Sequence, residues 1–385
     1  MPTAKRTHGF TESVIRGMTR LANQHGAINL AQGFPNFPAP GVLKQEAARA
    51  IDADINQYAI TWGSQRLREV LALRYHDWYG MDVDPEAEVT ITCGSTEAMA
   101  TTLLSLVNPG DEVVVFEPFY ENYGPDTILC DARPVYVPMA VGQRLDMDRI
   151  AAAFSDRTRA VIINTPNNPT GRVFSADELS GIAALCIQHD AYAVTDEIYE
   201  HIVYTGRHIP IATLPGMRDR TITISGASKT FSITGWRVGT IVAPVEETNA
   251  IRKVHDFLTV GAPAPLQEGV AAGLELLGAD YYGQLRSEYL ARREVMYRGL
   301  IAAGFRCEPP EGSYYILADF SELSELPDDE FARWLTTVIG VAVVPGSSFF
   351  SRPELGRRLV RFAFCKTIEV LEEAGERLRE IGKAR

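Results

Sequence analysis

Short apolar runs alternate with segments of helical periodicity through the middle of the chain. The runs predict strands at 89–92, 113–116, 160–164, 191–195, 221–225 and 238–243. Helices are expected between them, one over 96–107 that ends at the turn Asn-Pro-Gly-Asp (108–111) and one from the capping box Ser-Ala-Asp-Glu (175–178) to about His189. Strands that alternate with helices favour an α/β fold with a mostly parallel central sheet and flanking helices.

The pattern changes beyond Pro263. Long helices are expected as far as Leu300, and a smaller α+β unit follows from Phe305, with strands near 314–318, 341–344 and 359–364. With 385 residues the chain is longer than a single hydrophobic core usually supports. We therefore expect a large α/β domain and a smaller α+β domain.

Composition and charge narrow the function classes. The formal net charge of -12 and the lack of a dense Lys/Arg cluster argue against a nucleic acid as partner. The five cysteines are scattered and odd in number, which suits reduced thiols better than a disulfide framework. The sequence has no Cys-x-x-Cys or His-Glu-x-x-His motif, so no metal site is expected. No apolar run approaches the ~20 residues of a membrane span. We expect a cytoplasmic protein without a membrane partner.

The segment Ser-Gly-Ala-Ser-Lys-Thr-Phe-Ser-Ile-Thr-Gly-Trp-Arg (225–237) places Lys229 between small residues, with Arg237 eight positions later. Because little bulk surrounds the lysine, an aldehyde can reach its amine and form a Schiff base, while the guanidinium suits a phosphate. Pyridoxal phosphate (PLP) carries both an aldehyde and a phosphate. The alternative is a surface lysine in a polar loop.

Further motifs follow predicted strands, where the ligands of an open parallel sheet collect. Gly-Ser-Thr-Glu (94–97) opens a helix and offers backbone N–H groups and two hydroxyls to an anion. Asp196 ends a strand, with Tyr199 three residues later, and Asn168 lies in Asn-Asn-Pro-Thr-Gly (167–171). A carboxylate suits the ring nitrogen of PLP, and a phenol and an amide suit its ring oxygen. Each motif alone also fits a helix cap or a turn.

In this order along the chain, the motifs resemble the PLP-dependent class I/II aminotransferases of fold type I. The resemblance implies that Lys229 forms the Schiff base with PLP and then shuttles the proton at the substrate's α-carbon. It also implies the other cofactor contacts, with Asp196 at the pyridine nitrogen, Asn168 and Tyr199 at the ring oxygen, and Ser95, Thr96 and Arg237 at the phosphate. One departure is Gly226, which stands where many relatives have a phosphate-binding serine; Ser225 or Ser228 is expected to compensate.

The resemblance assigns two further tyrosines. Tyr120, in Glu-Pro-Phe-Tyr (117–120), is expected to stack on the ring, although a tyrosine after a strand is also a common core residue. Tyr58, in Asn-Gln-Tyr (56–58), is expected to reach the phosphate of the neighbouring subunit. A homodimer with active sites at the subunit interface is therefore implied.

Arg361 interrupts the apolar strand near the C-terminus. From the residues alone it is either a solvent-facing edge residue or a bidentate carboxylate clamp. The resemblance implies the clamp, so Arg361 is expected to hold the substrate α-carboxylate, with the backbone of Gly33 beside it.

Within the family the chain most resembles the kynurenine/glutamine and methionine aminotransferase group, through the segments 29–40, 56–58, 117–120 and 251–255. This implies a ping-pong transfer of the amino group of a large neutral L-amino acid (methionine, glutamine, an aromatic amino acid or kynurenine) to a 2-oxo acid. Phe34 and Phe349 are expected to form an apolar wall for the side chain, and Phe350 suits the wall and the core equally. The large PLP-binding domain is expected at 46–285, and the small domain at 1–45 and 286–385.

Three other functions share this kind of fold. A cysteine-S-conjugate β-lyase uses the same lysine and arginine, and only the dependence of turnover on a 2-oxo acid separates the two activities. An aspartate-type aminotransferase is disfavoured by Thr96, because some such relatives have a lysine there. A ligand-sensing domain of a transcription regulator requires a DNA-binding domain, for which the chain has neither spare length nor basic charge.

Overall fold

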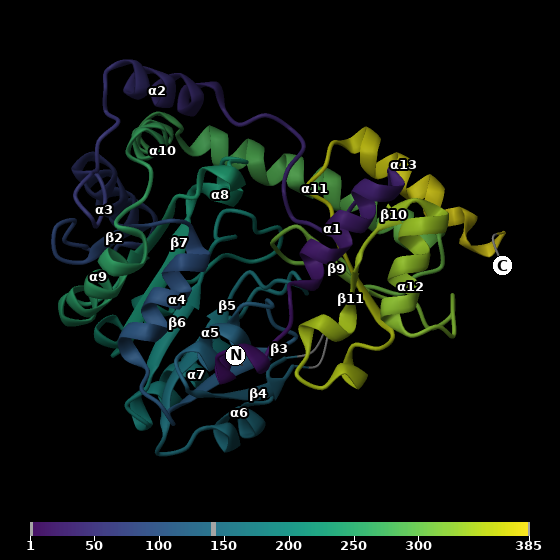
Figure 1. Ribbon diagram of the computed structural model, residues 1–385, viewed down its shortest axis with the longest axis horizontal. Helices are drawn as coiled ribbons and strands as arrows, with labels where there is room; N and C mark the ends of the chain where they lie inside the picture. Colours follow the sequence, from purple (N-terminus) through teal and green to yellow (C-terminus); the bar gives the residue numbers. More distant parts are fainter. Residues whose placement is uncertain (1–2, 140–143, 384–385) are drawn as a thin grey trace.

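Seven strands build the central sheet of the computed structural model, which describes residues 3–139 and 144–383. From edge to edge they are β2 (Val89–Thr92), β8 (Gly239–Val242), β7 (Thr221–Gly226), β6 (Tyr192–Asp196), β5 (Thr158–Asn164), β3 (Glu112–Glu117) and β4 (Arg133–Pro138). Neighbouring strands are parallel except at β8, which is antiparallel to both β2 and β7. The predicted α/β class with a mostly parallel sheet is confirmed (Figure 1).

Helices cover both faces of this sheet. Successive strand residues point to opposite faces, so Val113 and Val115 join one apolar cluster and Val114 and Phe116 join another. The first cluster includes side chains of α4 (Ser95–Leu106), α5 (Tyr123–Leu129) and α9 (Val245–Thr259). The second includes side chains of α6 (Met147–Ala153) and α7 (Ala176–Gln188). Burial on both faces explains why these strands are continuous apolar runs in the sequence.

The periodicity does not predict every element of the large unit. Strand β4 contains two prolines, Pro134 and Pro138, and lies at the edge of the sheet. Most of its residues are only partly buried there. It therefore lacks the apolar run that reveals the central strands. The predicted capping box of α7 is confirmed: the Ser175 hydroxyl accepts from the backbone N–H of Glu178, and the Glu178 carboxylate accepts from the backbone N–H of Ser175.

At the β2 edge of the sheet, a further layer is formed by α2 (Gly41–Asp52), α3 (Gln65–Tyr79) and α10 (Ala264–Leu276). Leu43 of α2 is fully buried in the same cluster as Val270 and Leu274 of α10. This layer places the segment between α2 and α3, which carries Tyr58, on the outside of the molecule.

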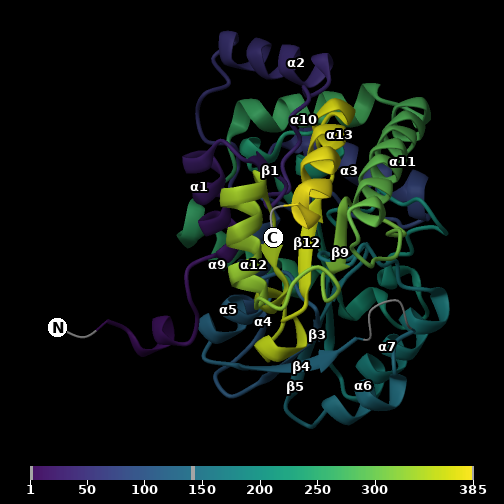
Figure 2. The ribbon, with the colours of Figure 1, turned by 90° about the vertical axis from the view of Figure 1, so that its right-hand side faces the viewer.

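The smaller unit contains a three-stranded antiparallel sheet in the order β11 (Val344–Pro345), β12 (Leu359–Ala363), β9 (Tyr315–Asp319). Beside it, β1 (Ile28–Asn29) pairs in parallel with β10 (Val341–Ala342), so the N-terminal segment lies with the C-terminal part of the chain. The helices around these strands are α1 (Val14–His25), α11 (Ala279–Ala302), α12 (Asp328–Trp334) and α13 (Ile368–Leu378) (Figure 2).

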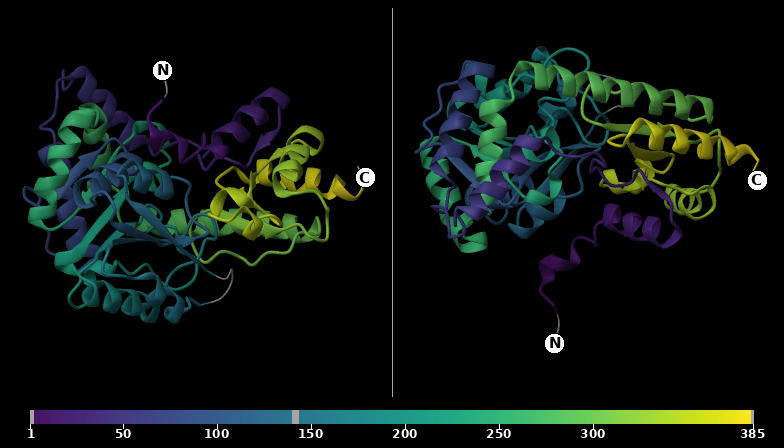
Figure 3. Two further views of the ribbon diagram at one scale, coloured as in Figure 1. Left: turned by 60° about the horizontal axis from the view of Figure 1, so that its bottom comes forward. Right: turned by 90° about the horizontal axis from the view of Figure 1, so that it is seen from above.

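Helix α11 runs from the large unit along the smaller one, beside α13 (Figure 3). It passes through position 285/286, where the second expected domain boundary lies, and the division into 46–285 against 1–45 and 286–385 stays a prediction. Ahead of α1, the chain with the 3-10 helix Lys5–His8 leads away from the small unit toward the large one. Among the described residues, no helix combines the length and apolarity needed to cross a membrane.

Candidate active site

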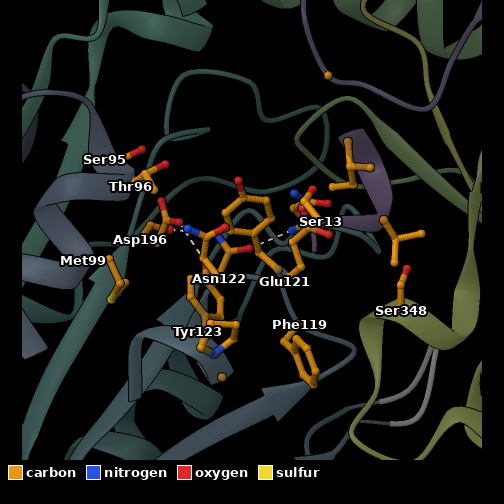
Figure 4. A pocket seen from close by; sticks show the side chains of 18 of the residues that line it. Ser13, Ser95, Thr96, Met99, Phe119, Glu121, Asn122, Tyr123, Asp196 and Ser348 are labelled. Atoms are coloured by element: carbon orange, nitrogen blue, oxygen red, sulfur yellow. Dashed lines mark hydrogen bonds between the residues drawn. The ribbon is translucent and has the colours of Figure 1, made fainter. Parts of the chain in front are cut away.

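A cavity of ≈ 950 Å³ lies at the carboxyl ends of the parallel strands, between the two units. All of the predicted site residues line it except Tyr58 and Phe349. Figure 4 shows Ser95 and Thr96 on one side of this cavity and Ser13 and Ser348 on the other. The large sheet, the N-terminal segment and the small unit therefore all contribute to one site.

Lys229 lies on the one-turn helix α8 (Ala227–Thr230), directly after β7. Its Nζ donates a hydrogen bond of 3.3 Å to the carbonyl oxygen of Gly33. Burial lowers the pKa of Lys229 to about 8, because desolvation disfavours the ammonium form, and the positive charge of Arg237 adds to this effect. About one tenth of a lysine with this pKa is neutral at pH 7, far more than of an ordinary lysine, and the neutral amine is the nucleophile.

Asp196 ends β6 with its carboxylate in the cavity wall. Oδ2 accepts a hydrogen bond of 2.8 Å from the hydroxyl of Tyr123, and Oδ1 accepts one of 3.3 Å from the backbone N–H of Ile198 (Figure 4). Burial raises the pKa of Asp196, whereas these hydrogen bonds and the charge of Lys229 oppose the rise. No Lys, Arg or His of the described residues forms an ion pair with this carboxylate. The buried carboxylate therefore has room for a cationic partner, such as a protonated nitrogen of a bound heterocycle.

The N-terminus of α4 and Arg237 form one end of the cavity. Gly94 has a φ of +83°, and a Cβ there would collide with the guanidinium of Arg237. A Cβ on Gly239 would lie 2.6 Å from the backbone nitrogen of Ser95. The two glycines thus let the arginine approach the helix N-terminus, a combination that suits an anion. The guanidinium donates to the carbonyl oxygens of Thr234 and Cys93 at 3.1 and 3.4 Å.

The two serines expected to compensate for Gly226 differ in position. Ser228 lines the cavity. Ser225 instead donates a hydrogen bond of 2.5 Å to Oε1 of Glu200, on the far side of the strand end, and does not line it. Ser228 is therefore the serine near the anion site.

Arg361 is fully buried in β12 and points into the cavity. Its Nη1 donates to Oδ1 of Asn168 at 2.8 Å and its Nη2 to the carbonyl oxygen of Ala31 at 2.5 Å. Nε has no hydrogen-bond partner among the described residues. The guanidinium lies 4.3 Å from the ring centre of Tyr315. A buried cation with an unsatisfied donor fits a carboxylate ligand.

Two tyrosines flank these charged groups. The hydroxyl of Tyr199 is 3.2 Å from that of Tyr315, and burial raises its pKa well above the ordinary value. Tyr120 lines the cavity with its ring edge-on to that of Tyr123, at 5.8 Å between ring centres. Tyr199 is therefore a neutral hydroxyl, able to donate a hydrogen bond.

Two predicted residues lie outside the cavity. Tyr58 is 86% exposed on the outer surface. Phe349 is fully buried, with its ring 4.9 Å from the guanidinium of Arg361, so it supports the arginine rather than the cavity wall. The neighbouring Phe350 and the predicted Phe34 do line the cavity. The expectation that Phe349 forms the wall is corrected accordingly: adjacent residues of this segment face opposite ways, and Phe350 faces the cavity.

The sequence reasoning missed several residues of the site. Tyr123, the partner of Asp196, lies three positions after Tyr120, a spacing that could have drawn attention to it. Ser13, which donates a hydrogen bond to Glu121, and Arg16 bring α1 to the cavity and carry no motif. Only the folded chain brings them to the site.

The arrangement fits pyridoxal phosphate. A lysine amine, an anion site at a helix N-terminus and a buried carboxylate that lacks a cation surround one cavity. These groups match the aldehyde, the phosphate and the ring nitrogen of that cofactor. Arg361 is a further cation in the lining, which these three groups do not use.

Comparison with known proteins agrees with this geometry. The family model described as aminotransferase class I and II matches residues 25–378. The chain is 39% identical to the probable N-succinyldiaminopimelate aminotransferase of Mycobacterium tuberculosis, over 98% of both chains. The solved structure of that enzyme covers 99% of this chain and 100% of its own, with 40% identity and a TM-score of 0.96.

Two further relatives have other substrates in their names. Human kynurenine–oxoglutarate transaminase 1 is 36% identical, with 98% of this chain and 97% of the relative covered. The methionine aminotransferase of Escherichia coli is 36% identical, with 96% of each chain covered.

Proposed function

This chain belongs to the class I and II aminotransferase family, and from that premise we propose that it moves the amino group of a large neutral L-amino acid to a 2-oxo acid with pyridoxal phosphate in the cavity. The amino acid leaves as its 2-oxo acid and the acceptor leaves as an amino acid, so the two half-reactions balance. The observation that carries the proposal is that Lys229, Asp196, Arg237 and Arg361 meet in one cavity.

When bound, pyridoxal phosphate withdraws electrons from the substrate's α-carbon. Lys229 would hold the cofactor through its amine, and the same amine would accept and return the α-proton of the substrate. Asp196 holds a proton on the ring nitrogen, and Tyr199 and Asn168 donate to the ring oxygen. The remaining assigned cofactor contacts are Ser95, Thr96 and Arg237 at the phosphate, with Ser228 beside them, and Tyr120 at the ring.

The substrate's α-carboxylate is assigned to Arg361 and to the backbone of Gly33. This is supported by the place of the Arg361 guanidinium in the cavity lining, next to Gly33 and Asn168. Phe34 and Phe350 offer an apolar surface for the substrate side chain. A neutral donor suits that surface, because an apolar wall provides no partner for a second carboxylate.

We also propose a homodimer in the cytoplasm. Tyr58 lies among exposed apolar side chains that a second copy of the chain would cover, namely Ile55, Ile60, Phe257, Leu258 and Val260. In such a dimer Tyr58 reaches the phosphate of the partner's site. Mixing Tyr58→Ala subunits with Lys229→Ala subunits tests this, because the mixed dimer regains one site with both residues. Activity that does not return on mixing contradicts the shared site.

One observation favours a second candidate, an amino donor with a distal carboxylate such as N-succinyldiaminopimelate. Arg16 lines the cavity, and its guanidinium has no ion-pair or hydrogen-bond partner among the described residues. The Mycobacterium tuberculosis relative carries that substrate in its name. Replacing Arg16 with Gln should reduce turnover of the acidic donor alone if this candidate is right.

A panel of amino donors tests the proposal directly. The purified protein is given PLP and then methionine, glutamine, phenylalanine, kynurenine, alanine, aspartate or N-succinyldiaminopimelate, and the loss of absorbance of the lysine-bound cofactor is followed. We expect the large neutral donors to react fastest. Aspartate as the best donor would indicate an aspartate-type enzyme. Turnover of a cysteine S-conjugate without any 2-oxo acid would indicate the β-lyase activity.

A further inference from the structure

His255 belongs to a segment, 251–255, that the sequence singles out and that the proposed chemistry leaves without a role. It lies on α9 with its side chain fully buried, behind the N-terminus of α4 rather than in the cavity. Its Nδ1 is 2.9 Å from Oε1 of Glu97, and its Nε2 is 2.9 Å from the carbonyl oxygen of Thr61. The imidazole thus joins the first turn of α4 to the segment that contains Thr61.

The partners of His255 determine its protonation. A carbonyl oxygen can only accept, so Nε2 carries a hydrogen. Glu97 has hydrogen-bond partners at both oxygens: Oε2 accepts the backbone N–H of Cys93 at 2.9 Å, and Oε1 lies 2.6 Å from the hydroxyl of Thr101, which is also 2.7 Å from the carbonyl oxygen of Glu97. Nδ1 faces this carboxyl at 2.9 Å and the hydroxyl of Thr259 at 3.2 Å, and an ionised Glu97 requires a hydrogen on Nδ1 as well. The geometry therefore favours an imidazolium paired with an ionised Glu97.

The charges around His255 agree with this state. Burial lowers the pKa of His255, but the hydrogen bond and the negative charge of Glu97 outweigh it, and the net shift is upward. The negative charge of Asp256, the next residue on α9, raises the pKa further. The other titratable groups nearby are Arg252, one turn earlier on α9, and the thiol of Cys93, whose pKa burial raises.

Glu97 links the imidazolium to the anion site. The residue stands in the first turn of α4, two positions after Ser95, and its carboxylate holds the N–H of Cys93. The carbonyl oxygen of Cys93 accepts from Nη2 of Arg237 at 3.4 Å. An uncompensated carboxylate at this point would repel a phosphate bound by the same helix N-terminus. The imidazolium cancels that charge.

The other ring nitrogen connects to the segment after Tyr58. Besides accepting from Nε2, Thr61 donates its hydroxyl to Oδ1 of Asp256 at 3.3 Å. Trp62, the next residue, accepts from the backbone N–H of Ile91 on β2. The segment that carries Tyr58 is thus tied to the end of α9 through the same histidine.

We propose that a protonated His255 is a positioning residue for the phosphate end of the cofactor site, which it serves by neutralising Glu97 and by tying the first turn of α4 to the Tyr58 segment. This inference rests on the proposed binding of PLP, and it concerns affinity for the phosphate rather than the chemistry at Lys229. A histidine that only filled the core would affect folding, whereas a charged His255 affects the affinity for the phosphate.

The first test is made on the protein without cofactor. Histidine labelled with ¹⁵N reports the protonation of both ring nitrogens, and His255→Gln identifies the signal among the seven histidines. We expect the His255 ring to carry both protons well above its ordinary titration range. A neutral tautomer at pH 7 would overturn the proposal, whether or not PLP binds.

The second test compares PLP with pyridoxal, which lacks the phosphate. We expect His255→Gln to weaken PLP binding about tenfold or more and pyridoxal binding by less than about twofold, because only the phosphate meets the uncompensated Glu97 charge. The double variant Glu97→Gln/His255→Gln should recover most of the lost PLP affinity, since both charges are then gone. His76→Gln is the matched control, as His76 also pairs with a carboxylate, Asp82, but on the exposed surface.

The outcomes separate the two proposals. Equal losses for PLP and pyridoxal, or unchanged PLP affinity in His255→Gln, contradict the positioning role. If His255→Gln does not fold, the single variant Glu97→Gln provides the comparison. We expect this variant to bind PLP as the wild type does and to have a neutral His255 ring. Failure of the wild-type protein to bind PLP at all contradicts the proposed function instead.

Discussion

The hydroxyl of Tyr123 donates a hydrogen bond of 2.8 Å to Oδ2 of Asp196, and both side chains are buried. Burial raises the pKa of Tyr123 far above its ordinary value, so the phenol stays a donor throughout the working pH range. The bond stabilises the ionised carboxylate against the burial that raises the pKa of Asp196. Tyr123 therefore helps keep Asp196 charged.

Replacing Tyr123 with Phe should lower kcat/KM about tenfold, since a hydrogen bond to a charged group contributes about 1.5–3 kcal/mol and part of this is regained by rearrangement. Asp196 must be ionised to hold the proton on the pyridine nitrogen of the cofactor, so the enzyme is active above the pKa of Asp196. Loss of the bond raises that pKa, and the acid limb of the rate profile should move to higher pH. Tyr192→Phe is the control, because Tyr192 donates to Glu247 from the opposite end of β6. An unchanged acid limb in Tyr123→Phe would contradict this.

Asp196→Asn should lower the rate by several orders of magnitude, whereas Asp196→Glu should keep some activity. The lost contribution is electrostatic stabilisation of negative charge at the substrate's α-carbon, which a neutral amide cannot supply. Steady-state kinetics with methionine and a 2-oxo acid measures this loss, and Asp190→Asn, in the turn before β6, is the control. An Asn variant within about tenfold of the wild type means that the carboxylate only caps the turn after β6.

Lys229→Ala should abolish transamination and leave the fold intact, because no other amine of the described residues lines the cavity. The far-UV circular dichroism should match the wild type, and borohydride reduction of the PLP-treated wild type should label Lys229 alone. Lys253→Ala is the matched control, because Lys253 is exposed on α9 and its loss should leave transamination unchanged. Wild-type turnover in Lys229→Ala, or a label on another lysine, would exclude the assignment.

The pKa of Lys229, lowered to about 8 by burial, predicts how covalent attachment of an aldehyde depends on pH. Only the neutral amine attacks, and it is the major form above that pKa, so the attachment rate should rise with pH and level off above about 8. Stopped-flow mixing of the cofactor-free protein with pyridoxal measures this rate without a titrating phosphate. A rate that still climbs steeply toward pH 10 would show a lysine with its ordinary pKa.

Arg361→Lys should lower kcat/KM for every amino acid tried, because lysine keeps the charge and loses the two-pronged geometry. Phe34→Ala should instead change the ranking of donors and affect methionine and aromatic substrates more than alanine, since a lost apolar contact is worth about 1–3 kcal/mol. Phe349→Ala should resemble the arginine variant, because Phe349 lies against the guanidinium. A donor panel for the three variants provides the measurement, and a selective effect of Arg361→Lys would contradict the clamp.

The central strands and the local motifs could be predicted from the sequence because their causes are local. Strands buried on both faces carry apolar residues and uncharged threonines, with charged residues confined to their ends, which is why β2, β5 and β7 are visible in the sequence. Lys229 stands out for the same kind of reason, since the small residues that keep its amine accessible are its own neighbours in the chain. The edge strand β4 has no such requirement and escapes prediction.

Which side chains meet was decided only by the tertiary structure. Arg361 bonds Ala31, 330 positions away, and Lys229 bonds Gly33, 196 positions away, and no local pattern encodes such distances. Phe349 and Phe350 are equivalent in the sequence, yet one supports Arg361 and the other lines the cavity, because the fold fixes which way this segment faces. His255 becomes an imidazolium only where α9 brings Glu97 and Thr61 to its two nitrogens. The sequence determined the chemical groups, and packing of distant segments determined their partners and hence their charge.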